Sequence, residues 1–318
     1  MIHVRGLART YNTPRGPVEA VRGVDLDVEA GEIVGFLGPN GAGKTTTLRM
    51  LTTLIEPTAG TGTVAGSDLR DDPVGVRRRI GYVPQGGSTL DEARAGEEIV
   101  YQARLYGLSK QEATERGRRL MAQLDLPGLW ERNCGSLSGG QRRRLDIAMG
   151  LTHEPGLVFL DEPTTGLDPQ ARSNLWEHIR SLRDDRGATV FLTTHYLDEA
   201  DALSDRILVI DQGRIIASGT PDQLKRDVSG DLIALTLADD AQAEKAAEVL
   251  GRLTSASDLA NDGHHLEVRV PAAGHVVPGL LRELDGLGIE LDAIEVRRPT
   301  LDDVFLSLTG RSLRDDEE

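Results

Sequence analysis

The sequence predicts an α/β protein in which a large first domain with a parallel sheet is followed by a smaller α/β domain. Three observations support this fold class. A glycine-rich loop, Gly38–Thr46, joins the apolar run Glu32–Leu37 to a segment with helical spacing, Thr46–Ile55. A second apolar run, Leu157–Leu160, ends in two acidic residues, and the composition changes near residue 220. Buried apolar runs that alternate with helical segments are typical of a parallel sheet.

The loop GPNGAGKTT matches the G-x-x-x-x-G-K-[ST] pattern of phosphate-binding loops. Its glycines let backbone N–H groups converge on phosphate oxygens, while the lysine reaches the terminal phosphates and the next hydroxyl binds magnesium. A glycine-rich turn with a chance lysine is the alternative, but a strand and a helix N-terminus flank the loop, as an anion site requires. The residues predicted to bind the nucleotide here are Gly38, Pro39, Asn40, Gly41, Ala42, Gly43, Lys44, Thr45 and Thr46.

The run Leu157–Leu160 reads as a buried strand that delivers Asp161 and Glu162 at its carboxyl end. Ligands of doubly wound sheets collect at that edge. We expect Asp161 to hold magnesium and Glu162 to take a proton from the attacking water. Two acids after a strand could also be a solvated loop or a helix cap. The continuation PTTGLDP, from Pro163 to Pro169, favours chemistry, because no local structure requires that run.

A third motif lies between the other two: Leu137, Ser138, Gly139, Gly140 and Gln141. Locally, this stretch could be a flexible turn and helix N-cap. In this order, however, the three motifs resemble the ATP-binding subunit of ATP-binding cassette (ABC) transporters. The resemblance covers residues 1–220 and implies a phosphate-loop NTPase core, an antiparallel β subdomain and a helical subdomain at about residues 86–155.

The resemblance also implies how ATP is hydrolysed. In the family, the signature motif of one subunit closes over the nucleotide held by the phosphate loop of the other, in a head-to-tail homodimer. Ser138 and the amides of Gly139 and Gly140 would then donate to the terminal phosphate in trans. This role is physically sensible, because a helix N-terminus offers unpaired donors and a favourable dipole.

Four further positions match the family. Gln85 corresponds to the glutamine that senses magnesium and water, and His195, 33 positions after Glu162, to the histidine that orients the water. Asp168 falls in the loop along the dimer interface. Tyr11 stands where the family stacks an aromatic ring on adenine, although ordinary packing would explain one aromatic residue equally well. The magnesium ligands implied by the resemblance are Thr45, Gln85 and Asp161.

The amino-acid composition restricts the kinds of partner that we expect for this protein. The net charge of −15 excludes nucleic acid as the main partner, and the single cysteine, Cys134, excludes an internal disulfide and suits a reducing cytoplasm. No apolar run approaches the 18 or so residues that cross a bilayer. If the protein serves a transporter, the pore therefore belongs to integral membrane permease subunits, and this chain is expected at the cytoplasmic face of the cell membrane, attached through them.

Residues 221–312 are predicted to form a β-α-β-α-β-α domain, followed by a disordered acidic tail at residues 313–318. From Thr220 to Glu318 there are 21 acidic and 10 basic residues, so this part holds −11 of the net charge. A solvated surface explains that acidity best. Its last segment, Arg297–Arg311, reads as a helix with Thr300 as N-cap and Gly310 after the last turn.

This segment, together with QRRRLDIAMGL after the signature, resembles the daunorubicin-resistance type of drug-export ATPase. The resemblance implies export of a drug, antibiotic or other hydrophobic compound through a separately encoded permease. One departure is LDEARAGEEIV, from Leu90 to Val100, where relatives carry a Leu-Thr-x-x-Glu-Asn type segment. An ATP-driven regulator of a membrane protein, without solute transport, stays open as an alternative. A ribosome or chromosome ATPase fits less well, because the chain has one cassette and no long insertion.

Overall fold

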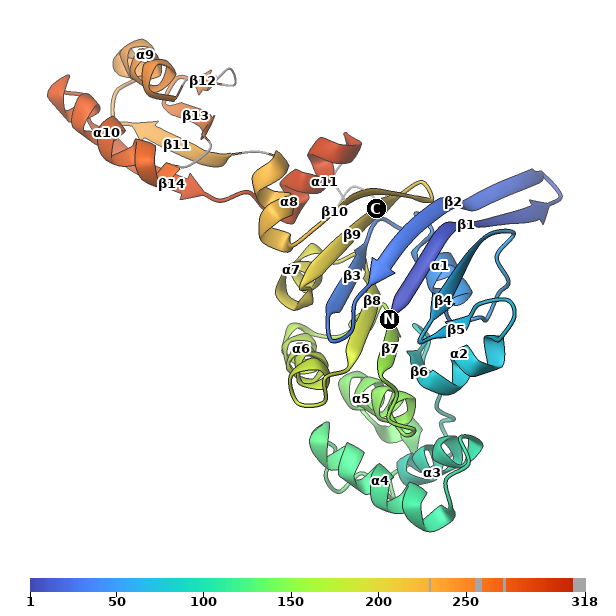
Figure 1. Ribbon diagram of the computed structural model, residues 1–318. Helices are drawn as coiled ribbons and strands as arrows, with labels where there is room; N and C mark the ends of the chain where they lie inside the picture. The colour runs from blue at the N-terminus through green and yellow to red at the C-terminus, as the bar shows by residue number, and fades with distance from the viewer. Residues whose placement is uncertain (229, 255–258, 271–272, 311–318) are drawn as a thin grey trace. The chain divides into compact units, whose positions relative to one another are not determined.

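The computed structural model of the protein describes residues 1–228, 230–254, 259–270 and 273–310 (Figure 1). Its contacts divide the chain into two compact units, Met1–Thr220 and the part from Pro221 onward. Each unit has its own hydrophobic core. The predicted acidic tail, residues 313–318, lies outside the described residues.

A six-stranded sheet in the order β10-β9-β3-β8-β7-β6 organises the first unit. Its strands are β3 Ile33–Leu37, β6 Ile80–Val83, β7 Leu157–Asp161, β8 Thr189–Thr194, β9 Arg206–Asp211 and β10 Arg214–Gly219. All neighbouring pairs are parallel except β9 with β10. Every residue of β3, β7 and β8 is buried. The sequences of β3 and β7 are near-continuous apolar runs, as is usual for strands covered on both faces, whereas β8 has three threonines beside its Val-Phe-Leu centre. Because β3, β6, β7 and β8 run parallel, the loops that follow them all lie at the carboxyl ends of the strands, on one side of the sheet.

Helices cover this sheet where the chain crosses between strands. They are α1 Lys44–Leu51, α6 Pro169–Asp184 and α7 Leu197–Leu203. The helical spacing had predicted that the first of these continues to Ile55. It ends at Leu51 because Thr53 adopts a left-handed backbone, with φ 58°, which a continuing α-helix does not allow.

A second, antiparallel sheet in the order β2-β1-β4-β5 packs against the first. It consists of β1 Ile2–Thr13, β2 Gly16–Val28, β4 Ala59–Val64 and β5 Ser67–Asp68, with α2 Pro73–Arg79 after it. Alternate residues of β1 and β2 are buried in one core with Phe36, Phe159 and Phe191 of the parallel sheet. This is the antiparallel β subdomain that the resemblance implies.

The segment between β6 and β7 is helical. It contains α3 Ala95–Leu105, α4 Lys110–Gln123, the short 3₁₀ helix η1 Cys134–Ser136 and α5 Gly139–Gly150. Figure 1 shows α3 and α4 beside each other beyond α5, and Ile99, Leu120 and Leu145 from the three helices share one core. These helices thus form a helical subdomain whose core is continuous with the core around α5.

The second unit has the elements α8 Pro221–Val228, β11 Asp231–Leu237, η2 Asp240–Gln242, α9 Ala243–Thr254, β12 Leu259–Asp262, β13 His265–Val270, α10 Ala273–Gly286, β14 Leu291–Arg297 and α11 Leu301–Thr309. The sheet order is β12-β13-β11-β14, and all pairs are antiparallel. From β11 to β14 the order β-α-β-β-α-β is that of the ferredoxin-like motif.

The sequence-based prediction for this unit lacked β12. This strand has four residues at the sheet edge, and three of them are exposed, so its sequence carries no apolar alternation. The terminal helix α11 begins as predicted. Thr300 Oγ1 accepts from the N–H of Asp303, and Gly310 has φ 72° at the C-terminal end. Within the unit, α11 packs against α8.

Among the described residues, no helix combines the length and the apolar character that crossing a bilayer requires.

Candidate active site

The glycine-rich loop between β3 and α1 takes a path that side chains would block. A Cβ on Gly38 would lie 2.2 Å from the Ile210 carbonyl oxygen. One on Gly43, where φ is 107°, would lie 2.6 Å from the Ala20 carbonyl oxygen. The loop therefore needs glycine at both positions, and it leads directly into the N-terminus of α1, where N–H groups and the helix dipole favour an anion.

Lys44 begins α1 and turns back into this loop. Its Nζ donates to the carbonyl oxygens of Gly38 at 2.7 Å and Pro39 at 3.0 Å, and lies 3.6 Å from Glu162 Oε1. Burial lowers the pKa of Lys44, and the nearby carboxylate of Glu162 opposes that shift. A buried ammonium held at a glycine-rich loop is well placed to contact phosphate oxygens.

Asp161 lies at the carboxyl end of β7 with its side chain buried. Its Oδ1 accepts from Thr193 Oγ1 at 2.7 Å and from Thr45 Oγ1 at 3.2 Å. The structure thus brings together a hydroxyl and a carboxylate that are 116 positions apart. Such oxygen ligands suit Mg²⁺, which usually takes one or two from protein and the rest from water and phosphates. The residues present fit the cation.

Glu162 is the centre of the site. Its Oε2 accepts from Gln85 Nε2 at 2.7 Å and from Thr165 Oγ1 at 3.2 Å, and lies 3.4 Å from His195 Nδ1. Four elements thus converge on one carboxylate: the loops after β6, β7 and β8, and α1 through Lys44. Sequence analysis predicted functional roles for Gln85, Glu162 and His195 separately, and the structure places them in contact.

These neighbours determine the protonation of Glu162. Burial by itself raises the pKa of the carboxyl group. The contact with His195 and the charge of Lys44, helped by Thr165, lower it more, so the net pKa of Glu162 lies below its ordinary value. Glu162 is therefore held as a carboxylate, the form that can accept a proton from water.

The backbone at Glu162 is unusual as well. Its φ is 44°, in the left-handed region that residues with a Cβ avoid. The N–H of Glu162 donates both to the carbonyl and to the hydroxyl of Thr193, at 3.1 and 3.0 Å. These bonds fix the turn that directs the side chain toward the glycine-rich loop.

A cavity of about 210 Å³ lies over the loop. The residues that line it belong to the glycine-rich loop, to α1 and to β2, and they include Gln85 and Glu162. The lining residues are Ala20, Pro39, Asn40, Gly41, Gly43, Lys44, Thr45, Thr46, Gln85 and Glu162.

The signature motif Leu137–Gln141 is absent from that lining. Ser138 instead caps α5: its Oγ accepts from the N–H of Gln141 at 3.2 Å, while Gln141 Oε1 accepts from the N–H of Ser138 at 3.0 Å. This reciprocal pair is a capping box. The N-terminus of α5 is thus capped by its own side chains and lies outside the cavity lining of its own chain.

Two further predicted residues, Asp168 and Tyr11, are also absent from the cavity lining. Asp168 caps α6 by accepting from the N–H of Ala171 at 2.8 Å. Tyr11 is on β1, opposite Val18, and the guanidinium of Arg9 lies 4.8 Å from its ring centroid. From the same sheet, Ala20 lines the cavity and Tyr11 does not.

Sequence reasoning missed Arg143. This α5 residue is buried, and its guanidinium donates to three carbonyl oxygens: Pro84 at 2.5 Å, Asp161 at 2.9 Å and Pro163 at 2.8 Å. It thereby ties the helix after the signature to the loops that carry Gln85 and Glu162. The only signal in the sequence was a run of three arginines at Arg142–Arg144, which resembles a solvated surface. Thr193 and Thr165 were missed too, because threonine near a strand end is common.

The combination of loop, acids and helix defines the class of protein. Residues 21–165 match the family model "ABC transporter", and residues 219–309 match the model "ATP-binding protein DrrA1-3-like, C-terminal domain". The chain belongs to the ABC transporter family as an ATP-binding subunit, and it is an ATP-hydrolysing enzyme.

Comparison with individual proteins shows which members of the family this chain is similar to. The chain is 42% identical to the daunorubicin resistance ATP-binding protein DrrA3 of Streptomyces coeruleorubidus, over 98% of this chain and 97% of that protein. It is 44% identical to the daunorubicin/doxorubicin resistance ATP-binding protein DrrA of Streptomyces peucetius, over 99% and 94%. A solved dimer of the ATP-binding cassette MJ0796, bound to ADP and phosphate, superposes with a TM-score of 0.64 at 25% identity, covering 69% of this chain and 98% of that one.

Proposed function

We propose that this subunit powers the export of a drug, antibiotic or other hydrophobic compound through a separately encoded membrane permease. The observation that carries the enzymatic half is the convergence of Gln85, Thr165, His195 and Lys44 on the Glu162 carboxylate. The transport half is supported by the relatives, which are named for resistance to daunorubicin and doxorubicin.

In the proposed reaction, Glu162 accepts a proton from the water that attacks the terminal phosphate of ATP, and His195 orients that water. Lys44 stabilises the charge on the transferring phosphoryl group. Mg²⁺, held by Thr45 and Asp161 with Gln85 nearby, would neutralise phosphate charge when bound. Because the carboxylate is buried and already ionised, it needs no further change of protonation to act as base.

We further propose that the site is completed by a second copy of the chain, head to tail. The capped N-terminus of α5, with Ser138 and the amides of Gly139 and Gly140, would contact the terminal phosphate bound to the partner, and Asp168 would lie along the interface. The absence of this motif from its own chain's cavity lining supports this arrangement, as does the dimeric form of the solved cassette. The proposal for Tyr11 is that it stacks on adenine, once Arg9 moves off its ring.

The permease would bind at the helical subdomain. A groove of about 200 Å³ lies between that subdomain and the core, lined in part by Leu54, Tyr82, Gln102 and Tyr106. On α3 of the same subdomain, Tyr101 and Leu105 are exposed at 65% and 64% and lie four positions apart on one face of the helix. Exposed apolar patches of this kind mark contact surfaces. Docking there would attach the chain to the cytoplasmic face of the membrane.

The test is to purify the chain from membranes of its own host together with whatever it binds. We expect a polytopic membrane protein to copurify, and the complex in proteoliposomes should move daunorubicin in an ATP-dependent way, with Glu162→Gln as the inactive control. Daunorubicin serves as a probe because the relatives carry its name. Recovery of no membrane protein would contradict the proposal, and a partner that moves no tested hydrophobic compound would point instead to a regulator.

A further inference from the structure

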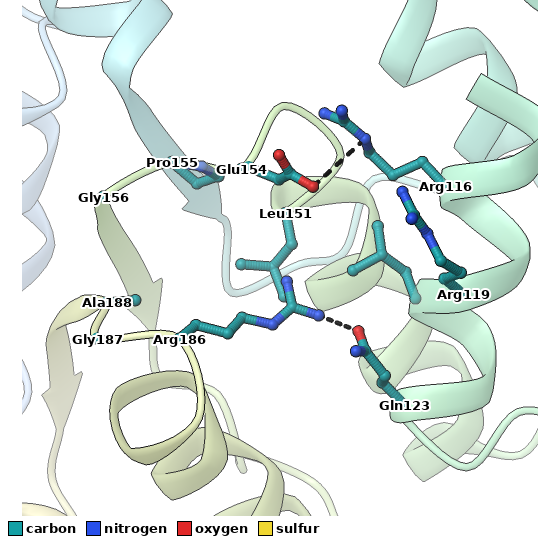
Figure 2. Close-up of a pocket in the computed structure, with 11 residues that line it drawn as sticks. Arg116, Arg119, Gln123, Leu151, Glu154, Pro155, Gly156, Arg186, Gly187 and Ala188 are labelled. Carbon is teal, nitrogen blue, oxygen red and sulfur yellow. Dashed lines mark hydrogen bonds and ion pairs between the residues drawn. The ribbon is translucent and has the colours of Figure 1, made fainter. Parts of the chain in front are cut away.

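A second cavity lies at the opposite edge of the parallel sheet from the nucleotide cavity. It has a volume of about 460 Å³ and is bounded by α4, by the loop before β7 and by the turn before β8 (Figure 2). Gly156 and Ala188 line it, and each immediately precedes a strand whose far end carries the active site. Its size falls in the range of small-molecule sites, about 300–1,000 Å³.

Three arginines surround the cavity. Arg116 and Arg119 come from one face of α4, and Arg186 comes from the turn between α6 and β8. Figure 2 shows Arg186 reaching across to Gln123, one turn further along the same face of α4, to which it donates a hydrogen bond. Positions three, four and seven apart on a helix share a face, so α4 presents a single basic wall.

Only part of this positive charge is neutralised. Arg116 Nε lies 3.5 Å from Glu154 Oε1, and Nη1 of the same guanidinium donates to the Thr152 carbonyl oxygen at 3.0 Å. Arg186 contacts a neutral amide, and Arg119 has no carboxylate partner within the described part of the chain. With one acid among the lining residues, the cavity carries an excess of two positive charges in a chain whose net charge is −15.

The floor of the cavity is apolar. Leu120, Leu151 and Ala188 line it and are almost completely buried, and Pro155 completes this surface. A guanidinium presents a planar fork of donors that matches a carboxylate, sulfonate or phosphate, while the apolar floor accommodates a hydrocarbon body. Neither inorganic phosphate nor a neutral hydrocarbon would use both parts.

We infer that this cavity binds a small amphiphilic organic anion, with its acidic head between Arg119 and Arg186 and its apolar body against Leu120 and Leu151. The inference stands apart from the export function proposed above. Because Arg119 belongs to the helical subdomain and Arg186 to the core, the bound anion would link the two parts of the cassette. The site uses none of the residues that line the nucleotide cavity.

The probe is naphthalene-1-sulfonate, titrated calorimetrically into the full chain with the nucleotide site saturated by Mg-ADP. We expect binding of one equivalent that weakens about tenfold or more in Arg119→Ala and in Arg186→Ala, since each removes a charge-assisted hydrogen bond. The matched control is Arg118→Ala. Arg118 neighbours Arg119 on α4, but its guanidinium lies over the Trp130 ring, 4.6 Å from the centroid. Binding should be unchanged in this control.

Two more measurements locate the ligand and test its chemistry. Hydrogen exchange with and without the probe should show protection within residues 116–123, 151–156 and 186–188. The neutral analogue 1-naphthylmethanol should bind at least tenfold more weakly if the arginines hold the acidic head. The proposal is overturned if the sulfonate does not bind, if both arginine variants bind it as the parent does, or if protection appears only elsewhere.

Discussion

Gln85 donates a hydrogen bond from its Nε2 to Oε2 of Glu162 over 2.7 Å. This bond joins the loop after β6 to the end of β7, and the loop after β6 leads directly into the helical subdomain. A movement of that subdomain would therefore change the environment of the carboxylate that we propose as the base. A permease docked on the helical subdomain would therefore be coupled to hydrolysis through this single contact.

Replacement of Glu162 by glutamine should leave ATP binding intact and lower the hydrolysis rate by about 10²–10⁴, the usual contribution of a general base. The amide keeps the size of the side chain but cannot accept the proton. The measurement is single-turnover hydrolysis, with gel filtration in ATP to detect an accumulated dimer. Glu244→Gln, an exposed carboxylate on α9, is the control. Near-normal turnover in Glu162→Gln would remove this residue as the base.

Lys44→Ala should weaken ATP binding by about tenfold to a hundredfold, because charge-assisted hydrogen bonds to the phosphates are lost. Binding can be followed by equilibrium titration with a fluorescent ATP analogue. Lys245→Ala, an exposed lysine on α9, should bind like the parent protein. Equal affinities in all three proteins would contradict the contact between Lys44 and the phosphates.

The composite site can be tested by mixing two inactive variants. Ser138→Arg blocks the signature and Lys44→Ala disables the phosphate loop, so a heterodimer of the two retains one complete site. We expect each variant alone to be nearly inactive and the mixture to recover part of the activity of the parent. Heterodimers should be isolated with two different affinity tags. If purified heterodimers hydrolyse no ATP, the site is not shared between subunits in this way.

Arg143→Met should destabilise the first unit. It leaves two buried carbonyl oxygens and the partly buried one of Pro84 without their donor, at a cost of about 1 kcal/mol each or more. For a unit of this size the melting temperature should fall by roughly 6 °C or more. Arg118→Met, on the exposed face of α4, controls for the loss of an arginine, and an equal effect in both variants would refute the role of Arg143.

The pH dependence of hydrolysis follows from the lowered pKa of Glu162. The carboxyl group stays ionised at and somewhat below its ordinary pKa of 4.5, and activity is lost only as pH falls through the lowered value. Thr165→Val removes one of the hydrogen bonds that lower this pKa, so the acid limb of the rate profile should move to higher pH. Exposed Thr61→Val should leave the limb in place, and a shift to lower pH in Thr165→Val would contradict the assignment.

Much of the fold follows from patterns in the sequence. The buried strands β3 and β7 are visible as apolar runs, and the loop Gly38–Thr46 fixes the strand-to-helix connection. The caps of α11 were readable from Thr300 and Gly310. The edge strand β12 was not, because its exposed side chains follow no period, and the early end of α1 depends on one backbone angle at Thr53.

The candidate site, too, contains residues that the sequence predicts and residues that it does not. Motifs predict Lys44, Asp161 and Glu162 as site residues, since a phosphate-binding loop has its lysine at a fixed spacing and the two acids follow a buried strand. The partners Thr193 and Arg143 carry no such signal. Each acts by contacting atoms that are distant in sequence, such as the Asp161 carboxylate 32 positions from Thr193, and only the sheet order brings them together.

The left-handed backbone at Glu162 has a consequence for evolution and engineering. A residue with a Cβ held at φ 44° stores about 1–3 kcal/mol of strain, which glycine at this position would relieve. A library screened only for heat resistance would thus be drawn toward glycine here and would lose turnover without any sign of misfolding. The backbone at Glu162 is thus kept in an unfavourable conformation that turns an acidic group toward the glycine-rich loop.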